Sequence, residues 1–93
     1  MNVINKLINN SWADAEIIDL SYLNNDILTL KIKNYKEEIS EFEIKNIFKL
    51  FFEDYLNDDI SEIKGELLDD VYTISIISAS TDKEIIKFSF FID

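Results

Sequence analysis

The apolar residues of the first segment recur at the spacing of one face of a helix. They are Val3, Ile4, Leu7 and Ile8, and the run ends near Asn9 and Asn10. This spacing predicts a short amphipathic N-terminal helix whose apolar side caps a core. Trp12 stands at the joint between this helix and the next element. We interpret it as a core residue, and the alternative is an anchor for a partner.

From Ala15 the period changes to two, which is typical of a strand with one buried face. The apolar positions of two successive runs are Ile18, Leu20 and Tyr22, and then Leu28, Leu30 and Ile32. The intervening Asn-Asn-Asp at 24–26 predicts a turn, because these residues tolerate the left-handed conformations of tight hairpins. Asp14 is likewise interpreted as a turn residue. The two runs should therefore form an antiparallel hairpin.

The segment from Asn46 to Leu56 fits two kinds of structure. Phe42 and Ile44 alternate with charged residues and begin a third strand. Beyond them the apolar positions also satisfy the i, i+3, i+4 spacing of a helix. Those positions are Ile47, Phe48, Phe51, Phe52, Tyr55 and Leu56. Strand and helix both stay open for this segment.

The C-terminal part predicts further strands, because β-branched and aromatic residues dominate it. Ile60 to Leu67 is interpreted as a loop or a short strand, Val71 to Ala79 as a strand, and Glu84 to Ile92 as the closing strand after a turn at 80–83. In the closing strand Ile86, Phe88, Phe90 and Ile92 share the core face. Phe91 and Ile85 fall on the other face, where they form either an exposed apolar patch or a surface that the helix covers.

These elements predict an α+β fold with a mainly antiparallel β-sheet of about five strands and a short N-terminal helix, in a single domain over residues 1–93. The chain has no cysteine, histidine or arginine, so all nine cations are lysines. Disulfides, thiolate or imidazole metal sites and Ser-His-Asp or Cys-His catalysis are therefore excluded. We expect a protein that is not an enzyme and that uses no cofactor and no metal.

The net charge of -10 bears on partners and location. Nucleic acid is not an expected partner, because the chain repels phosphates and lacks the arginine fork that grips them. A membrane is not expected either, since no apolar run approaches the roughly 18 to 20 residues of a membrane-spanning helix. No secretory signal is recognised at the N-terminus, and the expected location is cytoplasmic. The pattern predicts no oligomeric state.

The acidic residues concentrate between Glu53 and Asp70, a segment that contains eight of them and a single lysine, Lys64. Such a segment is a candidate docking face for a basic protein, and the alternative is a solvated loop that keeps the domain soluble. Its spacing does not fit a calcium loop, because Ile60 interrupts the acids and Gly65 is out of register. The predicted partner-binding residues are Asp54, Tyr55, Asp58, Asp59, Glu62, Glu66, Asp69 and Asp70.

The run Trp12-Ala13-Asp14-Ala15-Glu16-Ile17 resembles the W-H-D-A-x-I opening of small, mostly uncharacterised bacterial domains, some of them encoded beside toxin genes and interpreted as immunity proteins. Ala13 stands where those domains have histidine, so no catalytic or metal role is carried over. The resemblance implies a small β-rich fold and a place in toxin neutralisation. It also favours the strand for Asn46 to Leu56.

The predicted function is that of a protein-binding inhibitor, an immunity-type protein that neutralises a basic toxin or nuclease through its acidic face. The alternative is a phage or plasmid-borne inhibitor that mimics nucleic acid and blocks a restriction or CRISPR-type defence enzyme. A mimic should repeat its acids along one face at a phosphate-like spacing on the order of 7 Å. An enzyme based on carboxylate, lysine or tyrosine chemistry is a further alternative, and a deep pocket with convergent carboxylates would favour it.

Overall fold

A computed structural model describes residues 6–8, 12–23, 27–53 and 59–91 of the chain. Residues 6–8 are helical. The strands are β1 (Ala15–Leu23), β2 (Ile27–Lys33), β3 (Ile39–Ile44), β4 (Ile47–Phe52), β5 (Asp59–Leu68), β6 (Val71–Ser78) and β7 (Glu84–Phe91). They form one antiparallel sheet in the order β3-β2-β1-β5-β6-β7-β4.

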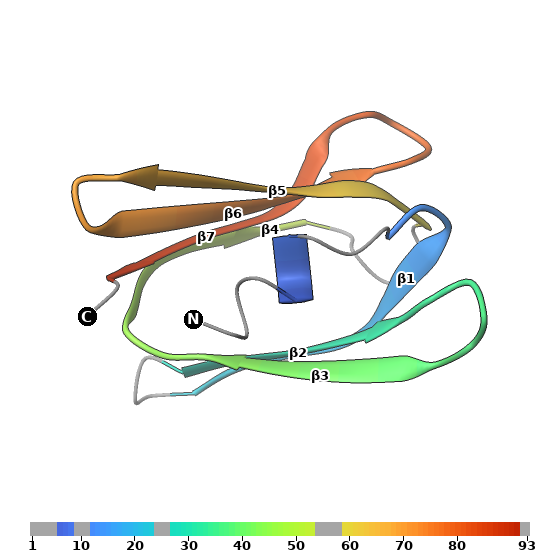
Figure 1. The fold of residues 1–93 in the computed structure, drawn as a ribbon, viewed down its shortest axis with the longest axis horizontal. Helices are drawn as coiled ribbons and strands as arrows, with labels where there is room; N and C mark the ends of the chain where they lie inside the picture. Colours follow the sequence, from blue (N-terminus) through green and yellow to red (C-terminus); the bar gives the residue numbers. More distant parts are fainter. Residues whose placement is uncertain (1–5, 9–11, 24–26, 54–58, 92–93) are drawn as a thin grey trace.

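This sheet folds over into two layers, one made of β1, β2 and β3 and the other of β4, β5, β6 and β7 (Figure 1). β1 and β5 pair only where Ala15 faces Ile60 and Glu16 faces Asp59, and the two strands then diverge. At the other end of the molecule, Lys45 and Asn46 connect β3 to β4. Asn46 takes a left-handed φ of 64° at this corner, which asparagine tolerates well. The two layers are therefore joined at both ends and form a sandwich. β3 and β4 are the edge strands of the sheet.

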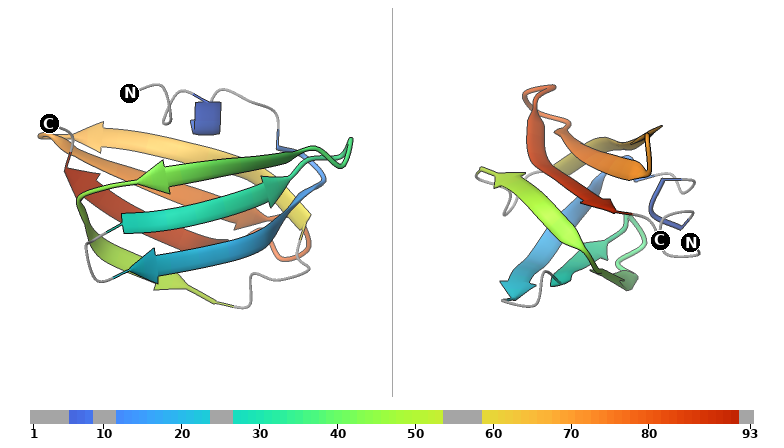
Figure 2. Two further views of the ribbon diagram at one scale, coloured as in Figure 1. Left: turned by 90° about the horizontal axis from the view of Figure 1, so that it is seen from below. Right: turned by 90° about the vertical axis from the view of Figure 1, so that its left-hand side faces the viewer.

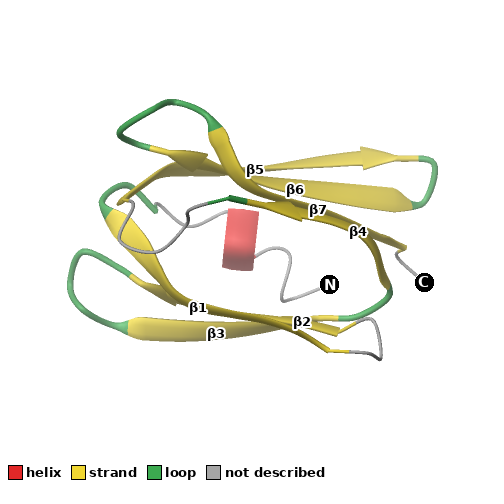
Figure 3. Cartoon of the chain, turned by 180° about the vertical axis from the view of Figure 1, so that it is seen from behind, coloured by secondary structure: helices red, strands yellow, loops and turns green. Residues whose placement is uncertain are grey.

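The inward side chains of both layers meet in a single apolar core, and the helical residues lie between the layers (Figure 3). Leu7 is fully buried, and the Trp12 indole N–H donates a hydrogen bond of 2.6 Å to its carbonyl oxygen. The Trp12 ring packs edge-to-face on Phe42, with ring centroids 5.9 Å apart. Trp12 is thus a core residue, as predicted, and Asp14, with a φ of 66°, is a turn residue.

The mainly antiparallel sheet is confirmed, but it has seven strands rather than about five, and the described helix is very short. Ile47 to Phe52 is a strand. Its apolar positions imitate helical spacing because Phe48 is an extra residue in a β-bulge, between the pairs Ile47–Phe90 and Lys49–Ser89. Ile60 to Leu67, interpreted as a loop or short strand, lies within the ten-residue strand β5.

A second bulge changes which residues of β1 face the core, relative to the prediction. Ile17 pairs with Ile32, and the next pair is Asp19 with Lys31, so Ile18 is the extra residue. Ile17 is therefore buried, and Ile18, predicted to face inward, is only partly so. In β7 the predicted Ile86, Phe88 and Phe90 are all buried, while Ile92 lies outside the described residues. Within the described part of the chain, no helix is long and apolar enough to cross a membrane.

Candidate functional site

The predicted acidic site extends along β5 and does not gather into one cluster. Asp59, Glu62 and Glu66 are exposed on this strand, and Asp69 and Asp70 form the turn that follows it. Asp54, Tyr55 and Asp58 lie outside the described residues. At about 3.3 Å per residue, the seven steps along the strand from Asp59 to Glu66 separate these two acids by roughly 23 Å. The described acids therefore form an acidic margin along β5, at one side of the layer β5-β6-β7-β4.

Asp69 and Asp70 have a structural task of their own. They are the two residues between the paired positions Leu68 and Val71, and their φ angles are 49° and 65°. Two positive φ values in a two-residue hairpin are typical of a type I′ turn, which favours aspartate, asparagine and glycine. The end of the acidic segment is thus explained by turn geometry.

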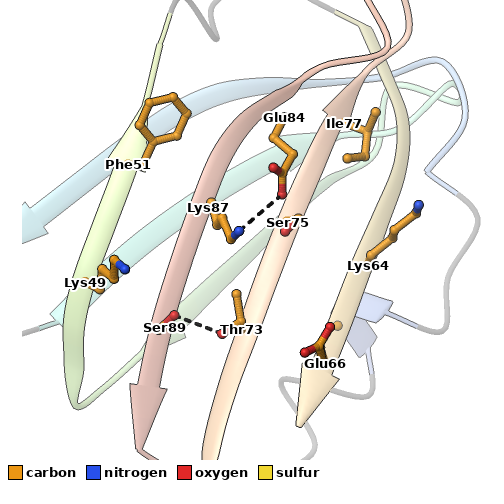
Figure 4. Close-up of a pocket in the computed structure, with 11 residues that line it drawn as sticks. Lys49, Phe51, Lys64, Glu66, Thr73, Ser75, Ile77, Glu84, Lys87 and Ser89 are labelled. Atoms are coloured by element: carbon orange, nitrogen blue, oxygen red, sulfur yellow. Dashed lines mark hydrogen bonds and ion pairs between the residues drawn. The ribbon is translucent and has the colours of Figure 1, made fainter. Parts of the chain in front are cut away.

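Glu62 and Glu66 belong to the outer face of the layer β5-β6-β7-β4, where side chains align in rows across four strands. One row is Lys64, Ser75, Lys87 and Phe51, and the next is Glu66, Thr73, Ser89 and Lys49. Flanking rows are Glu62, Ile77 and Glu84 on one side and Leu68, Val71 and Phe91 on the other. The two central rows line most of an open hollow of about 800 Å³ (Figure 4).

The charges on this outer face balance one another. Lys87 Nζ lies 3.8 Å from a carboxylate oxygen of Glu84, and Lys64 Nζ lies 3.5 Å from one of Glu62. In the neighbouring row, between Glu66 and Lys49, the hydroxyls of Thr73 and Ser89 are hydrogen-bonded at 2.9 Å. With Lys49 and Glu66 added, the rows hold three lysines and three glutamates. A chain of net charge -10 thus has one broad face that is close to neutral.

An aromatic patch, formed by Phe48 and Phe91, lies beside the row that ends in Lys49, and Phe51 lies on the other side of that row, where it lines the hollow. Phe48 and Phe91 stack with ring centroids 4.5 Å apart, yet remain 49% and 52% exposed. Phe51 is 46% exposed. The sequence indicated Phe91 but paired it with Ile85, which is buried because it is the extra residue of a bulge in β7. Phe48 and Phe51 were missed, since their spacing reads equally well as a buried helical stripe.

Among the described residues, no group of three acidic side chains converges as a metal site would require. Comparisons with models of known protein families, with curated protein sequences and with solved structures find no match to this chain. The resemblance to small bacterial immunity-type domains therefore stays a prediction, and the function has to be argued from the surface itself.

Proposed function

We propose that this protein binds another protein through the outer face of the layer β5-β6-β7-β4, as an immunity-type inhibitor of a basic toxin or nuclease. The observation that carries the proposal is the exposed aromatic patch, set on the same face as the acidic strand β5. Partly exposed aromatic rings beside a polar rim are typical of the centre of a protein interface. On a small domain, an apolar patch of this kind marks an association surface.

The charge of the acidic margin favours a basic partner. Asp59, Glu62 and Glu66 are all exposed along β5, and the Asp69-Asp70 turn continues the margin. Opposed charges at an interface rim raise the association rate and reject unsuitable partners. A basic protein would thus be steered toward β5, while Phe91 and Phe48 would supply the apolar contact.

The signs of the charges along β5 favour this proposal over nucleic-acid mimicry. Alternate residues of a strand point to the same face at a spacing of about 6.6 Å, which is close to that expected of a mimic. In β5, however, Lys64 stands between Glu62 and Glu66 on the outer face. The row therefore alternates in sign, whereas a strand of phosphates is uniformly negative.

The test compares two variants that each remove three exposed acids at constant side-chain volume. Asp59→Asn/Glu62→Gln/Glu66→Gln alters the acidic margin, and the matched control Asp19→Asn/Glu41→Gln/Glu43→Gln alters the other layer. Binding is measured by stopped flow, at low and high salt, to a basic protein captured from the source lysate or encoded by the adjacent gene.

We expect the β5 variant to associate more slowly, with a flatter salt dependence, because rim charges act through a field that salt screens over about 8 to 10 Å. Phe91→Ala should instead raise the dissociation rate, by about tenfold for a hot-spot residue. Identical kinetics for the β5 variant and its control would remove the acidic margin from the interface.

A further inference from the structure

The edge strand β4 is unusually apolar for an exposed sheet margin. Its only pairing within the described residues is with β7. Its sequence is Ile-Phe-Lys-Leu-Phe-Phe, with Lys49 as the single charge. An exposed apolar edge is a template for pairing with another strand, and proteins usually protect such an edge with charges or proline. The bulge at Phe48 disturbs only the start of β4, so the pairing-competent part begins at Lys49.

We propose that β4 pairs antiparallel with β4 of a second copy of this chain, about a two-fold axis that passes through Phe51. Glu53 extends the strand, because its backbone N–H donates a hydrogen bond of 2.9 Å to the carbonyl of Ile85. Backbone groups of alternate residues in an antiparallel ladder point to opposite sides. The N–H and C=O of Leu50 consequently point away from β7, toward the second copy.

The side chains on the outer face favour this register over one centred on Lys49. Directly opposed residues of antiparallel strands lie on the same face, and by alternation Lys49, Phe51 and Glu53 share the outer one. An axis through Lys49 would set two lysines directly against each other. An axis through Phe51 instead stacks the two Phe51 rings and places Lys49 opposite Glu53 of the second copy, twice by symmetry. Such self-complementarity is what a two-fold interface requires.

The distribution of charge also favours association of two copies along β4. Two copies of net charge -10 repel each other over most of their surfaces. On the layer that contains β4, the rows described above hold three lysines and three glutamates, and Glu53 adds one negative charge to that face. Pairing along β4 would join two such faces into one continuous eight-stranded surface, with the acidic β5 strands at its two far margins. This inference concerns a self-association that the proposed inhibitor function does not need.

A charge exchange at the axis tests the proposal by sedimentation equilibrium of the full chain. Lys49→Glu sets two glutamate pairs across the axis, and Glu53→Lys sets two lysine pairs. Directly opposed like charges destabilise a sheet, so each single variant should raise the dimer dissociation constant by about tenfold. The double variant Lys49→Glu/Glu53→Lys restores opposite charges and should return the constant to near the wild-type value.

Lys36→Glu is the matched control, because it makes the same change in net charge at an exposed turn residue between β2 and β3, in the other layer, and it should leave the dimer unchanged. The differences among the variants should shrink in 1 M salt, where screening acts over about 3 Å. A wild-type chain that stays monomeric at millimolar concentration would overturn the proposal. So would a dimer that both single variants leave intact, or a double variant that dissociates like the single ones. Because toxin binding is measured with changes on β5, the two proposals fail separately.

Discussion

The two edge strands, β3 and β4, are only two residues apart in the chain and have opposite chemistry. In β3, exposed Glu41 and Glu43 alternate with buried Phe42 and Ile44. In β4, two of the exposed residues are Phe48 and Phe51. Charges on β3 discourage pairing with another chain, while β4 has only Lys49 to do so. β3 is therefore an edge protected by charges, whereas β4 is an edge with which another strand could pair.

The two sides of the sandwich between its layers also differ, because the helical segment covers only the side of β3 and β5 (Figure 2). On the side of β3 and β5, the helical segment covers the space between the layers. Trp12 contacts Phe42 of β3, and Ile8 lies close to Gly65 of β5. On the opposite side, β1 and β4 lie at the margin without pairing to each other within the described residues. The N-terminal segment thus completes the core beside one edge strand only.

Matched phenylalanine truncations on the two edges should give the largest contrast. Phe42→Ala removes a buried ring from β3 and should cost about 3 to 5 kcal/mol of unfolding free energy, because it leaves a cavity beneath Trp12. Phe51→Ala removes a ring that is 46% exposed and should cost less than about 1 kcal/mol. Urea unfolding at low micromolar concentration measures both values in the monomer.

Against a total stability of about 5 to 15 kcal/mol, the loss at Phe42 could leave the domain partly unfolded at room temperature. Phe42→Leu is then the more useful variant, since it retains most of the apolar volume. Equal costs at Phe42 and Phe51 would show that β4 is as deeply packed as β3, and the comparison of the edges would not hold.

Gly65→Ala tests how tightly the covered margin is filled. A Cβ at this position would lie 2.7 Å from a ring carbon of Tyr72 and 3.0 Å from Ile8 Cγ2. Tyr72 has little room to yield, because its ring stacks on Phe90 with centroids 5.8 Å apart. We expect a loss of about 1 to 2 kcal/mol, as is typical of overpacking. Combining it with Tyr72→Leu should recover part of the loss, whereas a neutral Gly65→Ala would mean that the helical segment packs loosely here.

Regular alternation allowed much of this fold to be predicted from the sequence. Leu28, Leu30 and Ile32 were assigned to the core, as were Phe88 and Phe90, because the pairing of their strands leaves the period of two intact at these positions. The assignments failed at bulges, where one extra residue shifts the pattern to the other face. Ile18, Phe48 and Ile85 are the three residues concerned. A bulge is fixed by the partner strand, which a local pattern does not contain.

The candidate site was predicted less completely, for a related reason. A run of acids in the sequence does not distinguish residues that form a turn, such as Asp69 and Asp70, from residues on a strand face, such as Glu62 and Glu66. Nor does it show that Lys64, Lys87 and Lys49 come from three different strands to the same face. Those neighbours are created by pairing across the sheet.

The smallest expected effect concerns the ion pair between Lys33 and Glu16, which join β2 to β1 at directly opposed positions, 3.0 Å apart. The hydrogen bond and the charge of Glu16 raise the pKa of Lys33 above its ordinary value of 10.5, with a smaller contribution from Glu37. Since the folded pKa is the higher one, the pair stabilises the fold fully below pH 10.5, and this stabilisation is lost as the pH rises through the folded pKa. Glu16→Gln should therefore unfold at slightly lower urea than the wild type near neutral pH, and the gap should close above pH 10.5. Changes that affect both proteins alike cancel in this comparison, so the difference between them isolates the ion pair. A gap that persists unchanged at high pH would show that Glu16 acts through packing and that the ion pair does not stabilise the layer of β3. The two edges would then differ less, because Lys49 of β4 has no ion pair within the described residues either.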